Sequence, residues 1–174
     1  KGDTYNDDAD GTPLINGPVE FGERFTRQVK WTTAPTKLCG DGDLVVCVRG
    51  STTGKYVKSD GVYCLGRGVC AIRSKFQGFV DQVFEHQLPT LLAQVGGSTF
   101  PSWTGPQLKL HPVLVPEGKL LAGFEAHVEP MRDAVRAYSR QIDSLRTTRD
   151  LLLPKLISGE LDVSAMPEPE AFAA

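Results

Sequence analysis

The sequence predicts an α+β protein, in which a globular domain of mixed strands and helices precedes one long C-terminal helix. Up to about residue 115, short apolar runs alternate with Gly, Pro and Asp, which is typical of strands joined by turns. From about residue 120 the apolar residues recur every three or four positions, as in an amphipathic helix. We therefore expect a globular domain over 1–118, a helical region over 119–162 and a flexible tail over 163–174.

Within the expected domain, Leu44–Val57 and Val69–Arg73 are the clearest strand regions, because apolar and β-branched residues dominate them between turn residues. A helix is expected over Gln77–Gly96, and Pro89 should split or kink it, since proline lacks the backbone N–H that a helix interior uses. A last short strand is expected over 110–116.

In the C-terminal region, apolar residues step by four and three alternately, which is the heptad pattern of a paired helix. Pro130 predicts a break, with a short helix up to Glu129 and a longer one after it. A helix from Met131 to Ile157 would measure about 40 Å and needs a second helix to cover its apolar face. The expected pairing residues are Met131, Val135, Tyr138, Ile142, Leu145, Leu152 and Leu156.

Bulk properties exclude several classes of protein. No apolar run approaches the roughly 20 residues of a membrane-spanning helix. The four cysteines form no CxxC pair, and three lie in apolar runs, so we expect buried free thiols and a cytoplasmic location. The histidines lie at no spacing that completes a zinc site, and no cofactor is expected.

The net charge of −2 hides an uneven distribution of charge along the chain. Residues 21–75 carry ten basic side chains against four acidic ones, a net charge of +6 for this segment alone. A basic segment of this kind is a candidate surface for a polyanion such as a nucleic acid.

The loop GSTTGK, Gly50–Lys55, is similar in composition to a phosphate-binding P-loop, but it has three residues between its glycines instead of four, and Tyr56 follows the lysine. A strand, not a helix, is expected after it. Its polar side chains suit contacts with phosphates and base edges, although a solvated hairpin tip explains them equally well. The candidate DNA contacts are Arg49, Ser51, Thr52, Thr53, Lys55, Tyr56 and Lys58, then Arg24, Arg27 and Arg67 of the basic segment, and Ser98 and Thr99 of a later loop.

No catalytic motif is present, neither HExxH nor GxSxG nor a flanked pair of carboxylates, so we expect a protein without chemistry of its own. Trp31 and Trp103 are expected to pack in the core more than to contact bases.

Several segments together resemble the specificity subunit of type I restriction-modification enzymes. The most specific is RDLLLPKLISGELDV (Arg149–Val163), and VPEGKLLAGFEAHVEPMRDAV precedes it. GTPLI, GDLVVCVRGSTTGK and GGSTFPSWTG resemble recurrent segments of the target-recognition domain in that family. The resemblance covers essentially the whole chain.

The resemblance implies a non-catalytic module that binds double-stranded DNA and directs modification (methyltransferase) and restriction subunits to a bipartite target. A complete subunit of this family has two recognition domains and two long helices paired antiparallel as a coiled coil. This chain has one of each and lacks an opening strand. It is either the C-terminal half of a longer subunit or a half-sized subunit that forms a homodimer.

Two other functions remain open from the residues alone. One is a coiled-coil module that binds another protein and no DNA. The other is an enzyme with a degenerate nucleotide site at Gly50–Lys55, which the shortened loop disfavours.

Overall fold

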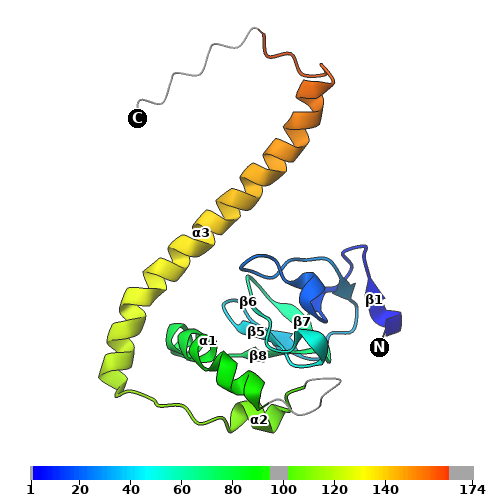
Figure 1. Cartoon of the computed structure of the whole chain (residues 1–174). Coiled ribbons are helices and arrows are strands. Elements are labelled where there is room, and N and C mark those ends of the chain that lie inside the picture. The colour runs from blue at the N-terminus through cyan, green and yellow to red at the C-terminus, as the bar shows by residue number, and fades with distance from the viewer. Residues whose placement is uncertain (1, 95–101, 165–174) are drawn as a thin grey trace. The chain divides into compact units, whose positions relative to one another are not determined.

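The computed structural model describes residues 2–94 and 102–164, and they confirm a mixed α+β domain followed by a long helix. The elements within the described residues are η1 (Gly2–Thr4), β1 (Tyr5–Asn6), β2 (Thr12–Ile15), η2 (Pro18–Glu20), β3 (Trp31–Thr32), β4 (Leu38–Cys39), β5 (Leu44–Cys47), η3 (Gly50–Thr52), β6 (Tyr56–Lys58), β7 (Tyr63–Leu65), β8 (Val69–Ile72), α1 (Gln77–Ala93), α2 (Gly105–Lys109) and α3 (Gly118–Ile157), where η marks a 3-10 helix (Figure 1).

The strands form two sheets. One has the order β1-β3-β2-β7-β4, and the other has the order β6-β5-β8. Strand β2 runs parallel to β7, with Ile15 opposite Leu65, whereas the other strand pairs of the two sheets are antiparallel. The expected strand regions Leu44–Val57 and Val69–Arg73 contain β5, β6 and β8, which confirms them.

Strand β5 lies at the centre of the domain, and its side chains alternate between two cores. Val45 and Cys47 pack with Ile15 and Tyr63 in the first core, which residues of both sheets build. Leu44 and Val46 belong to the second core, which Phe84 of α1 and Trp103 complete. Because strand side chains alternate between faces, the three-stranded sheet is packed on both sides, with α1 along one of them (Figure 1).

The cysteines are free thiols, as expected. Cys39, Cys47 and Cys64 are buried, and Cys70 is half-buried. Burial raises the pKa of Cys70 to about 11, so this thiol stays protonated at neutral pH. Trp103 is buried as predicted, and its indole N–H donates to the Leu91 carbonyl oxygen at 3.0 Å.

Helix α1 continues through Pro89 and is not split there, which corrects the first of the two outcomes expected for this proline, a split or a kink. Proline removes one hydrogen bond from the helix, and this loss is tolerable where the adjoining turns are held by packing. Phe84 and Leu91, on either side of Pro89, are both buried in the second core and supply that packing.

The segment over 110–116 is a second correction, because it forms no strand. Pro112 and Pro116 offer no N–H to a neighbouring strand, and Leu114 is 92% exposed. Apolar composition was therefore a misleading signal for a strand here.

Helix α3 corrects a third expectation, since its 40 residues form one helix that includes both Pro130 and Pro154. A proline forfeits one backbone hydrogen bond, but the many turns of a long helix around it remain bonded. The helix ends at Ile157, and Gly159 follows with φ of 74°, a helix stop that glycine adopts readily.

The chain divides into two compact units, Lys1–Glu129 and Pro130–Ala174, so the division falls inside α3. In the first unit, the Glu125 carboxylate of α3 accepts hydrogen bonds from the backbone N–H groups of Gly78 and Phe79 at the start of α1.

Within residues 2–94 and 102–164, no helix has the length and apolar character needed to cross a membrane. Most of the tail expected over 163–174 lies outside the described residues.

Candidate nucleic-acid interface

Three loops meet at one end of the two sheets, which we call the loop end and define as residues 16–22, 48–55 and 66–68. Strands β2 and β7 are parallel and finish side by side, and the Gly66 N–H donates to the Ile15 carbonyl oxygen at 2.7 Å. Strand β5 finishes opposite the start of β8, where the Val48 N–H donates to the Gly68 carbonyl oxygen at 2.9 Å. Residues that are far apart in sequence therefore share this end.

The loop after β5 is a compact turn that its own backbone holds together. Gly50 and Gly54 have φ of 79° and 91°, which favours glycine at both positions. The Thr53 N–H and hydroxyl both donate to the Gly50 carbonyl oxygen, at 3.0 and 2.8 Å. Strand β6 follows the loop, as predicted, so the loop does not open a helix in the way a P-loop does.

Five predicted contact residues project from this loop, and a sixth, Arg67, projects from the neighbouring turn. Arg49, Ser51, Lys55 and Arg67 are exposed, and Thr52 and Thr53 are half-buried. Among the described residues, Arg49, Lys55 and Arg67 make no ion pair, and their charges are therefore available to a ligand.

Tyr56 begins β6 beside this loop. Its ring packs edge-to-face on Phe84, with centroids 5.5 Å apart. Burial, followed by the nearby Glu85 carboxylate, raises the pKa of Tyr56, so its hydroxyl remains a neutral donor.

The structure does not bring the remaining predicted residues to the loop end. Lys58 lies opposite Leu44 at the other end of β6, and its ammonium group pairs with the Asp81 carboxylate of α1 at 2.7 Å. Arg24 lies beside Lys58 at that end, because the Lys58 backbone N–H donates to the Arg24 carbonyl oxygen. Arg27 is the exception, because its guanidinium donates to the Val19 carbonyl oxygen, which belongs to the loop end, and this contact directs it to the protein backbone. Ser98 and Thr99 lie outside the described residues.

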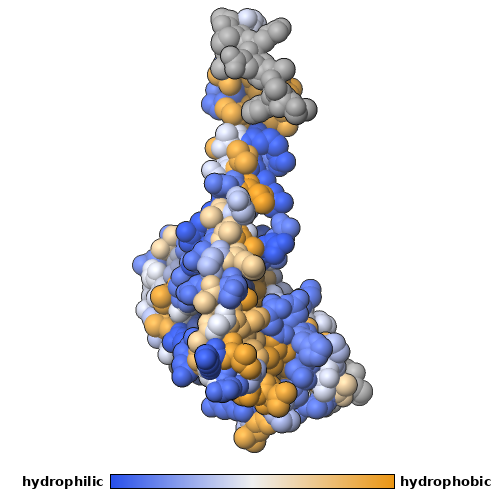
Figure 2. Space-filling view, turned by 90° about the vertical axis from the view of Figure 1, so that its left-hand side faces the viewer, coloured by the Kyte–Doolittle hydropathy of each residue, from blue (hydrophilic) through white to orange (hydrophobic). Residues whose placement is uncertain are grey.

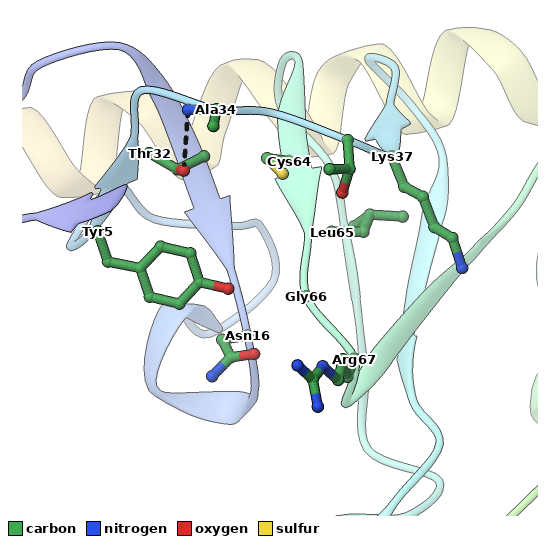
Figure 3. Close-up of a pocket in the computed structure, with 10 residues that line it drawn as sticks. Tyr5, Asn16, Thr32, Ala34, Lys37, Cys64, Leu65, Gly66 and Arg67 are labelled. Carbon is green, nitrogen blue, oxygen red and sulfur yellow. Dashed lines mark hydrogen bonds between the residues drawn. The ribbon is translucent and has the colours of Figure 1, made fainter. Parts of the chain in front are cut away.

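Sequence reasoning missed a cavity of about 580 Å³ at this end, between β2, β7 and the start of β4 (Figure 3). Tyr5, Asn16, Lys37 and Arg67 line it with polar groups, and no carboxylate is among its lining residues. Asn16 follows the apolar run of β2 directly, and Lys37 precedes β4. A polar residue just after a buried strand was the available signal.

The described residues hold no cluster of three or more side chains that suits a metal ion.

No protein-family model matches the sequence. The chain is 22% identical over 164 residues to the type I restriction enzyme MjaX specificity subunit of Methanocaldococcus jannaschii, a match that covers 92% of this chain and 38% of that protein. The chain is a homologue of type I restriction-modification specificity subunits. A second protein of the same organism, the type I restriction enzyme MjaIX specificity subunit, is 28% identical to this chain over 88 residues, which is 51% of this chain and 20% of that protein.

Solved structures of other proteins share the fold of this chain. The S subunit of the type I system from M. genitalium matches with a TM-score of 0.62 and 15% identity, over 91% of this chain and 41% of that one. The HsdS subunit of Thermoanaerobacter tengcongensis matches with a TM-score of 0.54 and 21% identity, over 91% and 40%. A structure described for assembly and conformational transition of the type I R-M system matches with a TM-score of 0.60 and 22% identity, over 89% and 40%. The chain thus spans about two fifths of the length of these three proteins.

Proposed function

We propose that this chain is a sequence-specific DNA-reading half of a type I specificity subunit. Its match to the MjaX specificity subunit over 92% of its length carries the proposal. The loop end supports it, because Arg49 and Lys55 make no ion pair among the described residues and offer positive charge to a phosphate backbone there. Residues 1–118 form the reading domain, and residues 119–162 form the spacer.

The spacer helix pairs antiparallel with a second helix of the same kind. Every one of its seven expected pairing residues is exposed in the single chain, and Figure 2 shows apolar and hydrophilic residues side by side along α3. Exposed apolar residues at heptad spacing are favourable only when a partner helix removes them from water. The second helix comes from another copy of this chain or from the other half of a longer subunit.

The chain itself is non-catalytic and carries no cofactor. It acts in the cytoplasm by directing modification and restriction subunits to a bipartite target, of which this domain reads one half. Two reading domains separated by a paired spacer of about 40 Å would meet the same face of DNA about one helical turn apart, since that distance is near ~34 Å.

The proposal is tested by co-expressing the chain with its methyltransferase partner and mapping methylated bases by long-read sequencing. We expect one bipartite motif, which is palindromic if the partner is a second copy. The absence of any methylated motif, with both proteins soluble and associated, would contradict the proposal.

The exposed heptad residues of α3 also favour the second candidate, a coiled-coil module that binds protein and not DNA. That function predicts helix pairing without binding to duplex DNA at low salt.

A further inference from the structure

We propose that the cavity lined by Asn16 and Arg67 is the base-reading site of this domain, and that these two side chains bind the major-groove edges of purines. This inference rests on the proposed function and goes further, because it assigns target specificity to a cavity instead of the Gly50–Lys55 loop.

Strand pairing places the two side chains next to each other although 51 positions separate them in the sequence. Asn16 follows Ile15 at the end of β2, and Arg67 lies two residues after Leu65, which is opposite Ile15 in β7. Figure 3 shows the Asn16 amide, the Arg67 guanidinium and the Tyr5 hydroxyl directed toward the same space. Polar groups on different strands thus converge on one ligand position.

The backbone on both sides of this space is held in place. The Glu20 carboxylate is buried and accepts hydrogen bonds from the N–H groups of Asn16 and Gly17, at 3.2 and 3.1 Å. A Cβ atom on Gly66 would lie 2.2 Å from the Asn16 side-chain oxygen, and one on Gly68 would lie 2.7 Å from the Asn16 carbonyl oxygen. The glycines on either side of Arg67 therefore let its turn lie directly against Asn16. Such fixed placement is what discrimination between bases requires.

The chemistry of the two side chains fits a purine edge better than a phosphate. Among the described residues, neither the Asn16 side chain nor the Arg67 side chain has a hydrogen-bond partner. An amide presents one donor and one acceptor group, which matches adenine N7 and N6, whereas a phosphate offers acceptors alone. A guanidinium presents a planar pair of donors, which matches guanine O6 and N7.

Two other side chains supply charge and a further donor without competing for the bases. The Lys37 carbonyl oxygen accepts from the Leu65 N–H at 2.7 Å, which anchors Lys37 at the edge of the cavity, and Figure 3 shows its side chain extending away from Asn16. Lys37 is therefore placed for an adjoining phosphate, and the Tyr5 hydroxyl is available to either group. None of the described residues that line the cavity is a carboxylate that would repel DNA.

The test compares the methylated motif of the full chain with those of Asn16→Ala and Arg67→Ala, each co-expressed with the methyltransferase. Duplexes that carry the wild-type motif, or one altered base pair at a time, then give the affinities of the purified complexes. We expect each variant to lose discrimination at one purine position, by about 10- to 100-fold, and to keep it at the others. Arg67→Lys should fail to restore it, because an ammonium group lacks the planar pair of donors.

Lys75→Ala is the matched control, since it removes one positive charge from the same unit outside the cavity. It should leave the motif unchanged, and thermal unfolding should show all variants folded. If either cavity variant weakens every duplex equally and leaves the motif intact, the cavity binds phosphate and the inference is wrong. The inference is also wrong if Asn16→Ala and Arg67→Ala both keep the wild-type motif and the wild-type affinity for DNA. A wild-type chain without any methylated motif is a different result, because it rejects the proposed function as well.

Discussion

At the residue scale, Gly66 lies directly against Asn16, with little room for a side chain. An added Cβ would lie 2.2 Å from the Asn16 side-chain oxygen and 3.0 Å from the Asn16 Cα. We expect Gly66→Ala to lower the free energy of unfolding by about 1–3 kcal/mol, because the Asn16 side chain must rotate away and the backbone beside it must shift. Urea denaturation measures this change.

Gly123→Ala is the control for that variant. Gly123 lies in α3, and apart from the helix's own backbone no atom of the described residues comes within 4 Å of an added Cβ. Alanine is the better helix former, so this substitution should stabilise the protein by up to about 1 kcal/mol. If both variants had the same effect, the close approach at Gly66 would not be the cause.

The contribution of Asp43 to the free energy of unfolding should depend on pH, and a single substitution can measure it. Burial favours its neutral form, but hydrogen bonds from Arg73 and from the Gly40 N–H outweigh burial, so the pKa of Asp43 is lowered from 3.8. A lowered pKa in the folded state adds stability above the unfolded-state pKa, and this stability is lost as pH falls through the folded-state pKa. Asp43→Asn should therefore cost about 1–3 kcal/mol near neutral pH, and progressively less as the pH falls through the folded-state pKa of Asp43.

Urea denaturation of the wild-type protein and the variant, at several pH values, measures that difference. The control is Asp150→Asn in the exposed pair with Arg149, where the side chains are 64% and 65% exposed and the ion pair contributes little at any pH. A constant difference between wild type and Asp43→Asn across the acidic range would contradict the prediction.

At the element scale, α3 exposes a row of apolar residues, and we propose that a partner helix covers them. Leu145 is 68% exposed and Leu152 is 42% exposed in the single chain. We expect Leu145→Asp or Leu152→Asp to convert a dimeric sample to monomer, because a carboxylate in the paired interface loses its hydration. Light scattering measures the mass.

Thr147 lies on the opposite face of the same helix, where its hydroxyl donates to the Asp143 carbonyl oxygen. Thr147→Asp adds the same charge and should leave the mass unchanged. Retention of the dimer in both leucine variants would show that this face of α3 is not the paired one.

At the scale of the whole molecule, the net charge of −2 is a poor guide to DNA binding, because local charge decides it. If Lys37, Arg49 and Lys55 contact phosphates, the affinity of each bound copy should fall with salt at a log–log slope of about −3. Fluorescence anisotropy on a motif duplex between about 50 and 200 mM salt measures that slope.

Lys55→Ala should make the slope shallower by about one, with the motif unchanged, while Lys75→Ala should leave it as it is. A slope near zero in the wild-type complex would exclude the loop end as the phosphate-binding surface.

By itself the sequence determined the features that depend on neighbouring residues. The short apolar run of β5 between turn residues predicted a strand, the spacing in α3 predicted a long amphipathic helix, and the loop Gly50–Lys55 was correctly placed between strands. Each of these patterns is local, since period and turn chemistry act within a few residues.

Tertiary structure decided what depends on partners distant in sequence. The packing of Phe84 and Leu91 keeps α1 continuous through Pro89. The Asp81 carboxylate engages Lys58, which composition alone had grouped with the loop residues. Parallel pairing of β2 with β7 brings Asn16 beside Arg67 and so forms the cavity. Strand pairing and core packing join residues tens of positions apart, and no local pattern in a single sequence records which of them will meet.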